Sequence, residues 1–367
     1  MEERNQPVGH LGIIGLRGTE PFLAKVDSYI REWRGQDEST LIKASCPRFG
    51  TGEGKAALGE TVRGYDLFIY CDPFNYGETY KMYGMTVPMS PDDHYADLKR
   101  VIGAAGGKQR RTTVIMPMLY EGRQHRRTGR ESLDCASMLQ ELVGLGVNNI
   151  ITCDAHDANV ANAIPGHGFE NLNPAYQYLK AVKRVLPDVD FRADDTVIIS
   201  PDEGAMSRCM YYTSALNIDL GMFYKRRDYS RVVDGRNPIV AHEYLGNDLT
   251  DKNAIVVDDM ISSGDSVIDI CEQLKSRGVK RILVFSAFGL FNAGLERMDR
   301  AYEQGLFDKI FTTNLIYQNP ELLHREWYCS VEMAKLIAYV IDTLNCDRSI
   351  SALLDPIDRI NKLLDRK

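Results

Sequence analysis

Residues 254–266 read AIVVDDMISSGDS and join an apolar run, two carboxylates and a Ser/Gly turn in one continuous stretch. The apolar run predicts a buried strand, and the following SVIDICEQLKSRG has the spacing of a helix that ends near Gly278. At the start of such a helix, unpaired backbone N–H groups and the positive end of the helix dipole attract a phosphate group. Gly264 allows the backbone to approach that group closely. The stretch therefore predicts a strand–turn–helix unit that holds a sugar phosphate.

The side chains of this stretch supply hydrogen-bond donors and acceptors. Ser262, Ser263 and Ser266 offer hydroxyl donors to a phosphate. Asp258 and Asp259 could accept hydrogen bonds from the vicinal hydroxyls of a ribose, or bind a Mg²⁺ ion that those hydroxyls also ligate. Paired aspartates also occur as ordinary helix caps, so the pair alone identifies no site. The complete string is far more specific than the pair.

The pattern of apolar strand, polar turn and helical spacing recurs along the chain. It predicts an α/β fold in which a mostly parallel sheet is flanked by helices. NNIITCDAHD and KNAIVVDDMISSGD share one order of residue types, which predicts two related domains, although any α/β protein has several such strand ends. We expect an N-terminal domain over 1–166, a C-terminal domain over 167–345 and a helical extension over 346–367, broken near Pro356. The apolar stretches are LGIIGL, DLFIYC, TTVIMPM, NIITCD, TVIIS, IDLGMFY, NAIVVDDM, RILVFSAF and KIFTTN.

Length and composition narrow the class of protein. With 367 residues, 44% hydrophobic and 26% charged, the chain is long enough for two globular domains. Its net charge of −7 gives no reason to expect a nucleic-acid partner, and it has no apolar run long enough to cross a membrane. The charged start, MEERNQPVGH, and eight scattered cysteines without a CxxC pair favour a reducing, cytoplasmic location.

Two basic islands and one irregular segment stand out from this acidic background. The islands are RQHRRTGR at 123–130 and KRRDYSR at 225–231, and each alone would be interpreted as a solvated face. Residues 73–93 are rich in Pro and Gly and show little periodicity, which predicts a surface loop suited to subunit contact or to a lid.

The 254–266 stretch resembles the phosphoribosyl-pyrophosphate loop shared by type I phosphoribosyltransferases and ribose-phosphate pyrophosphokinases. Further segments resemble the pyrophosphokinase family, in the family's order and over about residues 45–345. The resemblance implies two type I phosphoribosyltransferase-like domains. These segments are RFGTGEGKAALGETVRGYDLFIY at 48–70, PMLYEGRQHRRTGR at 117–130, TCDAHDANVANAIP at 152–165, SPDEGAMSR at 200–208 and FYKRRDYS at 223–230.

The resemblance implies a reaction and a role for each matched residue. The reaction is transfer of the pyrophosphoryl group of ATP to the 1-hydroxyl of ribose 5-phosphate, with Mg²⁺ as cofactor, in a dimer-based homo-oligomer that extends up to a hexamer. Lys225 and Arg227 would be catalytic, and His156 and Asp202 would bind the metal. The residues implied to bind ATP are Phe49, Glu53, Arg123, Gln124 and His156; those implied to bind ribose 5-phosphate are Asp202, Asp258, Asp259, Ser262, Ser263, Gly264 and Ser266.

The sequence departs from the family pattern at a few positions. Ser262 replaces an acidic residue, Asp265 replaces a Gly, His125 stands where the family often has Asp, and Thr51 replaces an acidic residue at the adenine. The 73–93 segment is an insertion. Two alternatives stay open: a phosphoribosyltransferase, and a non-catalytic regulatory paralogue of the kinase. Oligomeric state, allosteric regulation and the preferred diphosphoryl donor are not defined by the sequence.

Overall fold

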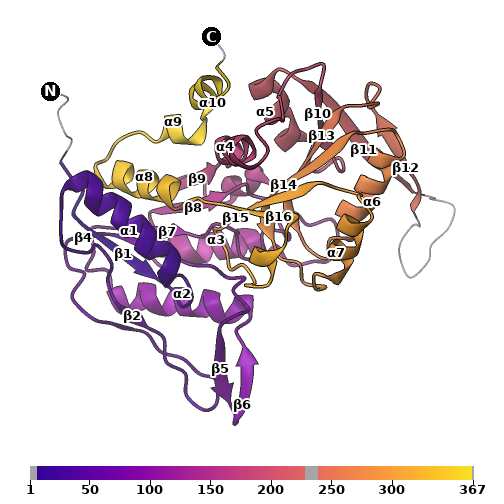
Figure 1. The fold of residues 1–367 in the computed structure, drawn as a ribbon. Helices are drawn as coiled ribbons and strands as arrows, with labels where there is room; N and C mark the ends of the chain where they lie inside the picture. The colour runs from indigo at the N-terminus through magenta and orange to yellow at the C-terminus, as the bar shows by residue number, and fades with distance from the viewer. Residues whose placement is uncertain (1–5, 228–238, 366–367) are drawn as a thin grey trace. The chain divides into compact units, whose positions relative to one another are not determined.

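A computed structural model of the chain describes residues 6–227 and 239–365 (Figure 1). Contacts divide the chain into two units. Each unit combines segments that are far apart in the sequence. The first contains Met1–Pro174, Asn314–Tyr317 and Glu332–Pro356, and the second contains Ala175–Thr313, Gln318–Val331 and Ile357–Lys367.

The first unit is built on a sheet of five parallel strands in the order β1-β4-β7-β8-β9. Helices connect most of these strands, as parallel pairing requires. Two small antiparallel pairs, β2 with β3 and β5 with β6, lie outside the sheet. The elements are β1 His10–Gly15, α1 Glu20–Arg34, β2 Ala44–Ser45, β3 Ala57–Leu58, β4 Tyr65–Tyr70, β5 Thr79–Met82, β6 Met85–Pro88, α2 Pro91–Ala105, β7 Arg111–Ile115, α3 Asp134–Gly144, β8 Asn149–Cys153, η1 Ala158–Ala163, β9 Gly168–Leu172, α8 Ala334–Asn345 and α9 Ser351–Leu354.

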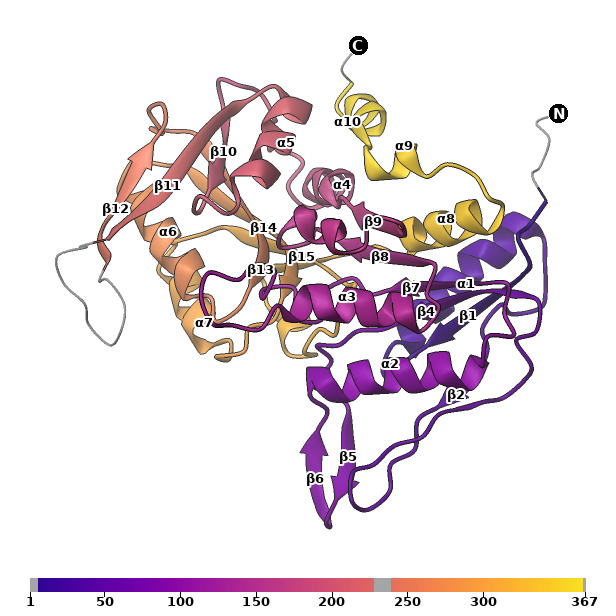
Figure 2. The ribbon, with the colours of Figure 1, turned by 180° about the vertical axis from the view of Figure 1, so that it is seen from behind.

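Successive residues of β4 face opposite sides of this sheet. Ile69 belongs to the apolar cluster formed with α2 and α3, whereas the ring of Tyr70 lies 5.2 Å from the ring of Phe22 on α1. α1 in turn packs along α8, where the stacked rings of Trp33 and Tyr339 are 4.2 Å apart. Opposite views show α1 and α8 on one face and α2 and α3 on the other (Figures 1 and 2).

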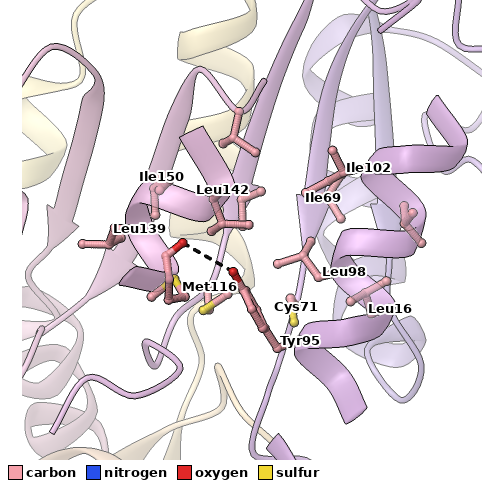
Figure 3. Packing of buried hydrophobic residues seen from close by; sticks show 14 of the residues in the cluster. Leu16, Ile69, Cys71, Tyr95, Leu98, Ile102, Met116, Leu139, Leu142 and Ile150 are labelled. Carbon is pink, nitrogen blue, oxygen red and sulfur yellow. Dashed lines mark hydrogen bonds between the residues drawn. The ribbon is translucent and has the colours of Figure 1, made fainter. Parts of the chain in front are cut away.

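The core between the sheet, α2 and α3 includes one polar contact (Figure 3). Tyr95 on α2 packs among apolar side chains such as Leu98 and Leu139, and its hydroxyl donates to the Met138 carbonyl at 3.4 Å and to Glu141 Oε2 at 2.7 Å. Burial, followed by the hydrogen bond to Glu141, raises the pKa of Tyr95. The hydroxyl therefore remains a neutral donor that links α2 to α3.

The second unit contains a seven-stranded sheet in the order β12-β11-β10-β13-β14-β15-β16. Its strands are parallel except for the edge strand β12, which pairs antiparallel with β11. Its buried aromatic residues include Phe285, whose ring stacks on that of Tyr178 at 4.9 Å. The elements are α4 Ala175–Val185, β10 Thr196–Ser200, α5 Met206–Leu216, β11 Asp219–Arg227, β12 Ile239–Leu245, β13 Asn253–Ile261, α6 Asp265–Lys275, β14 Arg281–Gly289, α7 Glu296–Glu303, β15 Lys309–Thr313, η2 Leu322–His324, β16 Tyr328–Val331 and α10 Ile357–Leu363.

The prediction of an α/β fold with parallel sheets flanked by helices is confirmed, and every quoted apolar stretch contains a strand. The 73–93 segment was expected to be a loop, but it contains the β5–β6 hairpin and the start of α2. The helical pattern after residue 346 does break at Pro356, between α9 and α10. Among residues 6–227 and 239–365, no helix has both the length and the apolarity needed to cross a bilayer.

The boundaries of the two units differ from those of the domains expected at 1–166 and 167–345. β9 pairs with β8, so residues 168–172 extend the first sheet. α8 packs on α1 and also belongs to the first unit. The expected extension is shared, since 346–356 falls in the first unit and 357–367 in the second.

A buried ion pair joins two neighbouring strands of the first sheet to the end of α8. Arg111 on β7 donates from Nε and Nη2 to the two carboxylate oxygens of Asp66 on β4, at 2.8 and 2.7 Å. Asp66 is fully buried and also accepts from Asn345 Nδ2 at 3.0 Å, while Arg111 Nη2 donates to the Leu344 carbonyl at 2.6 Å. The pair therefore connects the sheet to residues more than two hundred positions away.

We expect Arg111→Met to lower the free energy of unfolding by about 3 kcal/mol, because it leaves the Asp66 carboxylate buried without its cation. Urea titration measures this loss. Lys25→Met is the control, because the side chains of Lys25 and Glu332 are 59% and 38% exposed. Loss of this exposed ion pair should lower the free energy of unfolding by less than about 1 kcal/mol. Equal losses in the two variants would contradict the role given to the buried pair.

Candidate functional site

The predicted sugar-phosphate loop lies between the end of β13 and the start of α6. Gly264 is the residue that caps α6, with φ of +91°, and its carbonyl accepts the first helical hydrogen bond from the Ile268 N–H at 3.0 Å. A Cβ at this position would lie 2.6 Å from Sδ of Met298. Both the backbone conformation and the close neighbour therefore require glycine here.

The serines of this loop make local hydrogen bonds. Ser263 Oγ donates to Asp265 Oδ2 at 3.0 Å and accepts from the Asp265 N–H at 3.4 Å. Ser262 Oγ accepts from Asn292 Nδ2 at 3.2 Å, and the Ser262 carbonyl accepts from the Asn292 N–H at 3.0 Å. Ser266 is exposed on the first turn of α6. The loop is thus held in shape by neighbouring residues before any ligand binds.

The carboxylate of Asp265, which departs from the family pattern, has a cation beside it. Arg297 on α7 donates to Asp265 Oδ1, and both side chains are about half exposed. The ion pair balances the negative charge at the start of α6. This arrangement limits the repulsion that a carboxylate at 265 would otherwise exert on a bound phosphate.

Asp258 and Asp259 are adjacent acidic residues near the end of β13. The Asp259 N–H donates to Asp258 Oδ1 at 2.9 Å, and Asp259 is 4% exposed. Burial, and next the neighbouring Asp259 carboxylate, raise the pKa of Asp258 well above its usual range, while Arg208 acts in the opposite direction. Two adjacent carboxylates held in this way can accept hydrogen bonds from a diol or share a proton.

Asp202 sits in the turn that follows β10. Its Oδ1 accepts from the backbone N–H groups of Gly204 at 2.9 Å and Ala205 at 3.2 Å, just before α5 begins. Its carbonyl accepts from Ser200 Oγ at 2.7 Å. One carboxylate oxygen of Asp202 is therefore committed to the turn, and its role toward ribose and metal stays a prediction.

Arg123 and Gln124 follow β7 in the first unit. Glu121, just before them, has φ of +55°, an uncommon conformation for its residue type. Gln124 Nε2 donates to the carbonyls of Ser132 at 2.9 Å and Arg126 at 3.3 Å, whereas Arg123 is exposed. The Gln124 amide therefore braces the basic loop, and the Arg123 guanidinium is accessible to an anion.

The structure brings the Arg-Gln segment and the Asp-x-His segment together through two histidines. The rings of His125 and His156 meet edge to face with centroids 5.1 Å apart, and His125 Nε2 lies 3.6 Å from Asp157 Oδ2. His156 follows β8 by way of Asp154, whose φ is +47°. His125 departs from the family pattern. Its contact with His156 could not be foreseen, because the two residues are 31 positions apart in the sequence.

Phe49 and Glu53 lie at the two ends of a tight turn. The Phe49 N–H donates to the Glu53 carbonyl at 2.7 Å, and the Gly52 N–H donates to the Phe49 carbonyl at 2.9 Å. Glu53 Oε2 accepts from Thr51 Oγ1 at 2.8 Å. The Phe49 side chain is 55% exposed, which suits a flat ligand better than a core position.

Arg48, which the sequence analysis did not single out, anchors this turn. Its side chain is 3% exposed, and Nη1 donates to Asp97 Oδ1 on α2 at 2.5 Å. Its guanidinium lies 5.2 Å from the centre of the Tyr80 ring on β5. The turn that carries Phe49 is therefore fixed between α2 and the β5–β6 hairpin.

Lys225 and Arg227 end strand β11, opposite His242 and Ile239 of β12. Their side chains lie outside the part of the chain that the structure describes, as do residues 228–238, which include the rest of the second basic island. Their catalytic role stays a prediction.

Comparison with known proteins identifies relatives for both parts of the chain. Residues 11–146 match the N-terminal domain of ribose phosphate pyrophosphokinase, and residues 169–324 match the phosphoribosyl transferase domain. The chain is 26% identical over 317 residues to a ribose-phosphate pyrophosphokinase of Mycoplasma genitalium, covering 85% of this chain and 87% of the relative. It is 25% identical over 324 residues to that of Vibrio parahaemolyticus, covering 86% and 92%. The phosphoribosylpyrophosphate synthetase from Mycobacterium smegmatis has the same fold, with a TM-score of 0.74 at 17% identity over 91% of this chain and 98% of that one.

We expect Gly264→Ala to lower the free energy of unfolding by about 2 kcal/mol, because alanine is strained at φ of +91° and meets Met298. Thermal denaturation with calorimetry measures the loss. Gly166→Ala is the matched control, since a Cβ there meets nothing within 4 Å and should change stability by less than about 0.5 kcal/mol. A tolerated Gly264→Ala would refute the conformational requirement.

Asp258→Asn is expected to stabilise the protein by about 1 kcal/mol at neutral pH, as removal of strain at a functional site often does. The raised pKa of Asp258 means that the wild type loses stability as pH rises through that value, whereas the amide does not. Urea titrations from about pH 4 to about pH 8 should show the gap between variant and wild type widening with pH. For Asp248, where the Thr250 hydrogen bonds lower the pKa, replacement by Asn should instead reduce stability at the higher pH. If both Asp→Asn variants changed stability in the same direction at the higher pH, the opposite pKa shifts given to Asp258 and Asp248 would be contradicted.

Proposed function

Because this chain belongs to the ribose-phosphate pyrophosphokinase family, we propose that it transfers the pyrophosphoryl group of ATP to the 1-hydroxyl of ribose 5-phosphate, giving phosphoribosyl pyrophosphate and AMP. One observation carries the proposal: a single chain joins the family's N-terminal domain to a phosphoribosyl transferase domain, in which Gly264 caps α6. A phosphoribosyltransferase would account for the loop but not for residues 11–146. A regulatory paralogue would account for the fold but needs no accessible Arg123.

The sugar-phosphate side of the site is supported by the geometry of 258–266. α6 begins at Asp265, and the start of a helix attracts an anion; the pairing of Asp265 with Arg297 balances the carboxylate at this end. Asp258 and Asp259 lie near the end of β13, and we propose that they accept hydrogen bonds from the ribose diol. Their role is to hold the sugar and orient its 1-hydroxyl for attack.

The nucleotide side is supported by exposed groups of the first unit. Phe49 offers an aromatic face to adenine, and Glu53 lies at the other end of the same turn. Arg123 offers a planar guanidinium, which binds phosphate oxygens in pairs as a lysine cannot. We propose that Gln124 and His156 position this basic loop and the phosphates.

Transfer of a phosphoryl group needs positioning and charge stabilisation more than covalent chemistry. We propose that Lys225 and Arg227 stabilise negative charge that grows on the transferred group and on the departing AMP. The described residues contain no group of three or more His, Cys, Asp or Glu side chains able to hold a metal ion. Mg²⁺ is usually bound through one or two carboxylates together with substrate phosphates. Asp202 and His156 would complete its ligands, and the ion would neutralise phosphate charge.

The remaining proposals concern location and assembly. We place the protein in the cytoplasm, because all eight cysteines are free thiols. We also propose a dimer-based homo-oligomer, which the family resemblance implies. Its subunit number is measured directly by sedimentation equilibrium.

The test is to incubate the purified protein with Mg²⁺, ATP and ribose 5-phosphate and to follow AMP and phosphoribosyl pyrophosphate by ³¹P NMR. Lys225→Ala should lower kcat by about a hundredfold or more and leave the dissociation constant for ATP nearly unchanged. Lys280→Ala, an exposed lysine on another loop of the second unit, should keep wild-type kcat. Absence of AMP above background in the wild type would sink the kinase assignment. If Lys225→Ala weakened ATP binding but left kcat unchanged, Lys225 would be a residue that binds ATP and not a catalytic one.

A further inference from the structure

The tip of the β5–β6 hairpin has a backbone conformation that its sequence does not favour. Two residues, Tyr83 and Gly84, join Met82 to Met85, and their φ angles are +48° and +79°. A two-residue hairpin turn with both φ angles positive is the type I′ turn, for which Asn-Gly is the preferred pair. Glycine fits the second position, but tyrosine at the first position is strained.

Core packing does not account for this tyrosine. Tyr83 is 73% exposed, more than any other large hydrophobic side chain in the described part of the chain. Within residues 6–227 and 239–365, its ring stacks on no other aromatic ring. The backbone of Tyr83 is therefore strained although its side chain is not buried, which is typical of a residue that contacts a ligand or partner.

The hairpin is attached to the turn that carries Phe49. The Tyr83 N–H donates to the Gly50 carbonyl at 2.8 Å, so the two backbones are in direct contact. A Cβ on Gly52 would lie 2.8 Å from Met82 Sδ, which shows how closely the strand packs on the turn. Tyr83 and Phe49 are thus exposed aromatic residues on two segments joined by a hydrogen bond.

Buried contacts at the base keep this arrangement rigid. Arg48 is fixed by Asp97, and its guanidinium lies over the ring of Tyr80. Tyr80 in turn donates from its hydroxyl to Asp93 Oδ1 on α2 at 3.3 Å. The position of the hairpin tip relative to the Phe49 turn is therefore set before a ligand arrives, which lowers the entropic cost of binding.

We propose that Tyr83 is a base-binding residue that offers a second aromatic surface to the adenine of the nucleotide, beside Phe49. The inference rests on the proposed function for the placement of adenine at the Phe49 turn. Stacking of a base on an aromatic ring needs only a flat π-face, so Tyr83 should add affinity without selecting adenine over guanine. The β5–β6 hairpin would thus add affinity for the base, whereas the hydrogen-bonding residues of the Phe49 turn would select adenine. The two contributions can be measured separately.

The test replaces Tyr83 by the residue that the turn prefers. Tyr83→Asn relieves the backbone strain, so it should leave the melting temperature unchanged or raise it. It should nevertheless weaken AMP about tenfold in isothermal titration calorimetry, weaken GMP by a similar factor, and raise KM for ATP about tenfold. The kcat and the KM for ribose 5-phosphate should stay within about twofold of wild type.

Two further variants and one size measurement complete the test. Tyr83→Phe should retain wild-type affinity, because it keeps the ring, and Met85→Gln is the control for an exposed side chain on the same hairpin. If Tyr83→Asn binds AMP as tightly as the wild type does, the proposal is overturned. It is also overturned if the variant binds AMP more weakly only because it is less stable, as a lower melting temperature would show. A changed molar mass in sedimentation with unchanged AMP affinity would assign Tyr83 to contact with a second copy of the chain. A wild type that binds AMP but makes no phosphoribosyl pyrophosphate would refute the reaction while leaving the Tyr83 comparison intact.

Discussion

Parallel strands end at the same edge of a sheet, and this constraint positions most of the candidate site. In the five-stranded sheet Arg123 follows β7 and His156 follows β8, and in the seven-stranded sheet Asp202 follows β10 and the loop at 262–264 follows β13. Each chain segment must turn sharply at the end of its strand to enter the next element, and the start of a following helix attracts anions there. The Phe49 turn is the exception, because it follows no strand of the five-stranded sheet and depends instead on the buried Arg48.

The sharp turns require unusual backbone conformations next to the candidate residues. Glu121, Asp154 and Gly264 have positive φ just before or within the segments that bind phosphate in our proposal. Phe291, with φ of +44°, is held against Trp327 at 5.7 Å between ring centres, and the next residue, Asn292, hydrogen-bonds to the phosphate loop. Such strain persists only where surrounding packing enforces it, so each core also acts as the support of a binding loop.

The sequence predicts local features far better than long-range ones. The strands were identified because β-branched apolar runs have a short-range signal, and Gly264 because close approach of the backbone to a phosphate favours glycine. The β5–β6 hairpin was missed because Tyr83-Gly84 is a poor turn sequence and Pro88 obscured the second strand. The contact of α8 with α1 could not be foreseen, since nothing local in the sequence indicates which distant helix an apolar face will meet.

Two of the departures from the family pattern have charged neighbours that the fold brings close. Asp265 would weaken the anion-binding end of α6, but Arg297 comes from α7, 32 positions away, and forms an ion pair with it. His125 replaces a carboxylate that the family often has, yet Asp157 lies beside it and keeps a negative charge in the same region. In both places a charged side chain from another segment lies beside the changed residue. In our proposal both positions lie close to a bound phosphate, so the charge of the neighbouring side chain matters there as well as the identity of the changed residue.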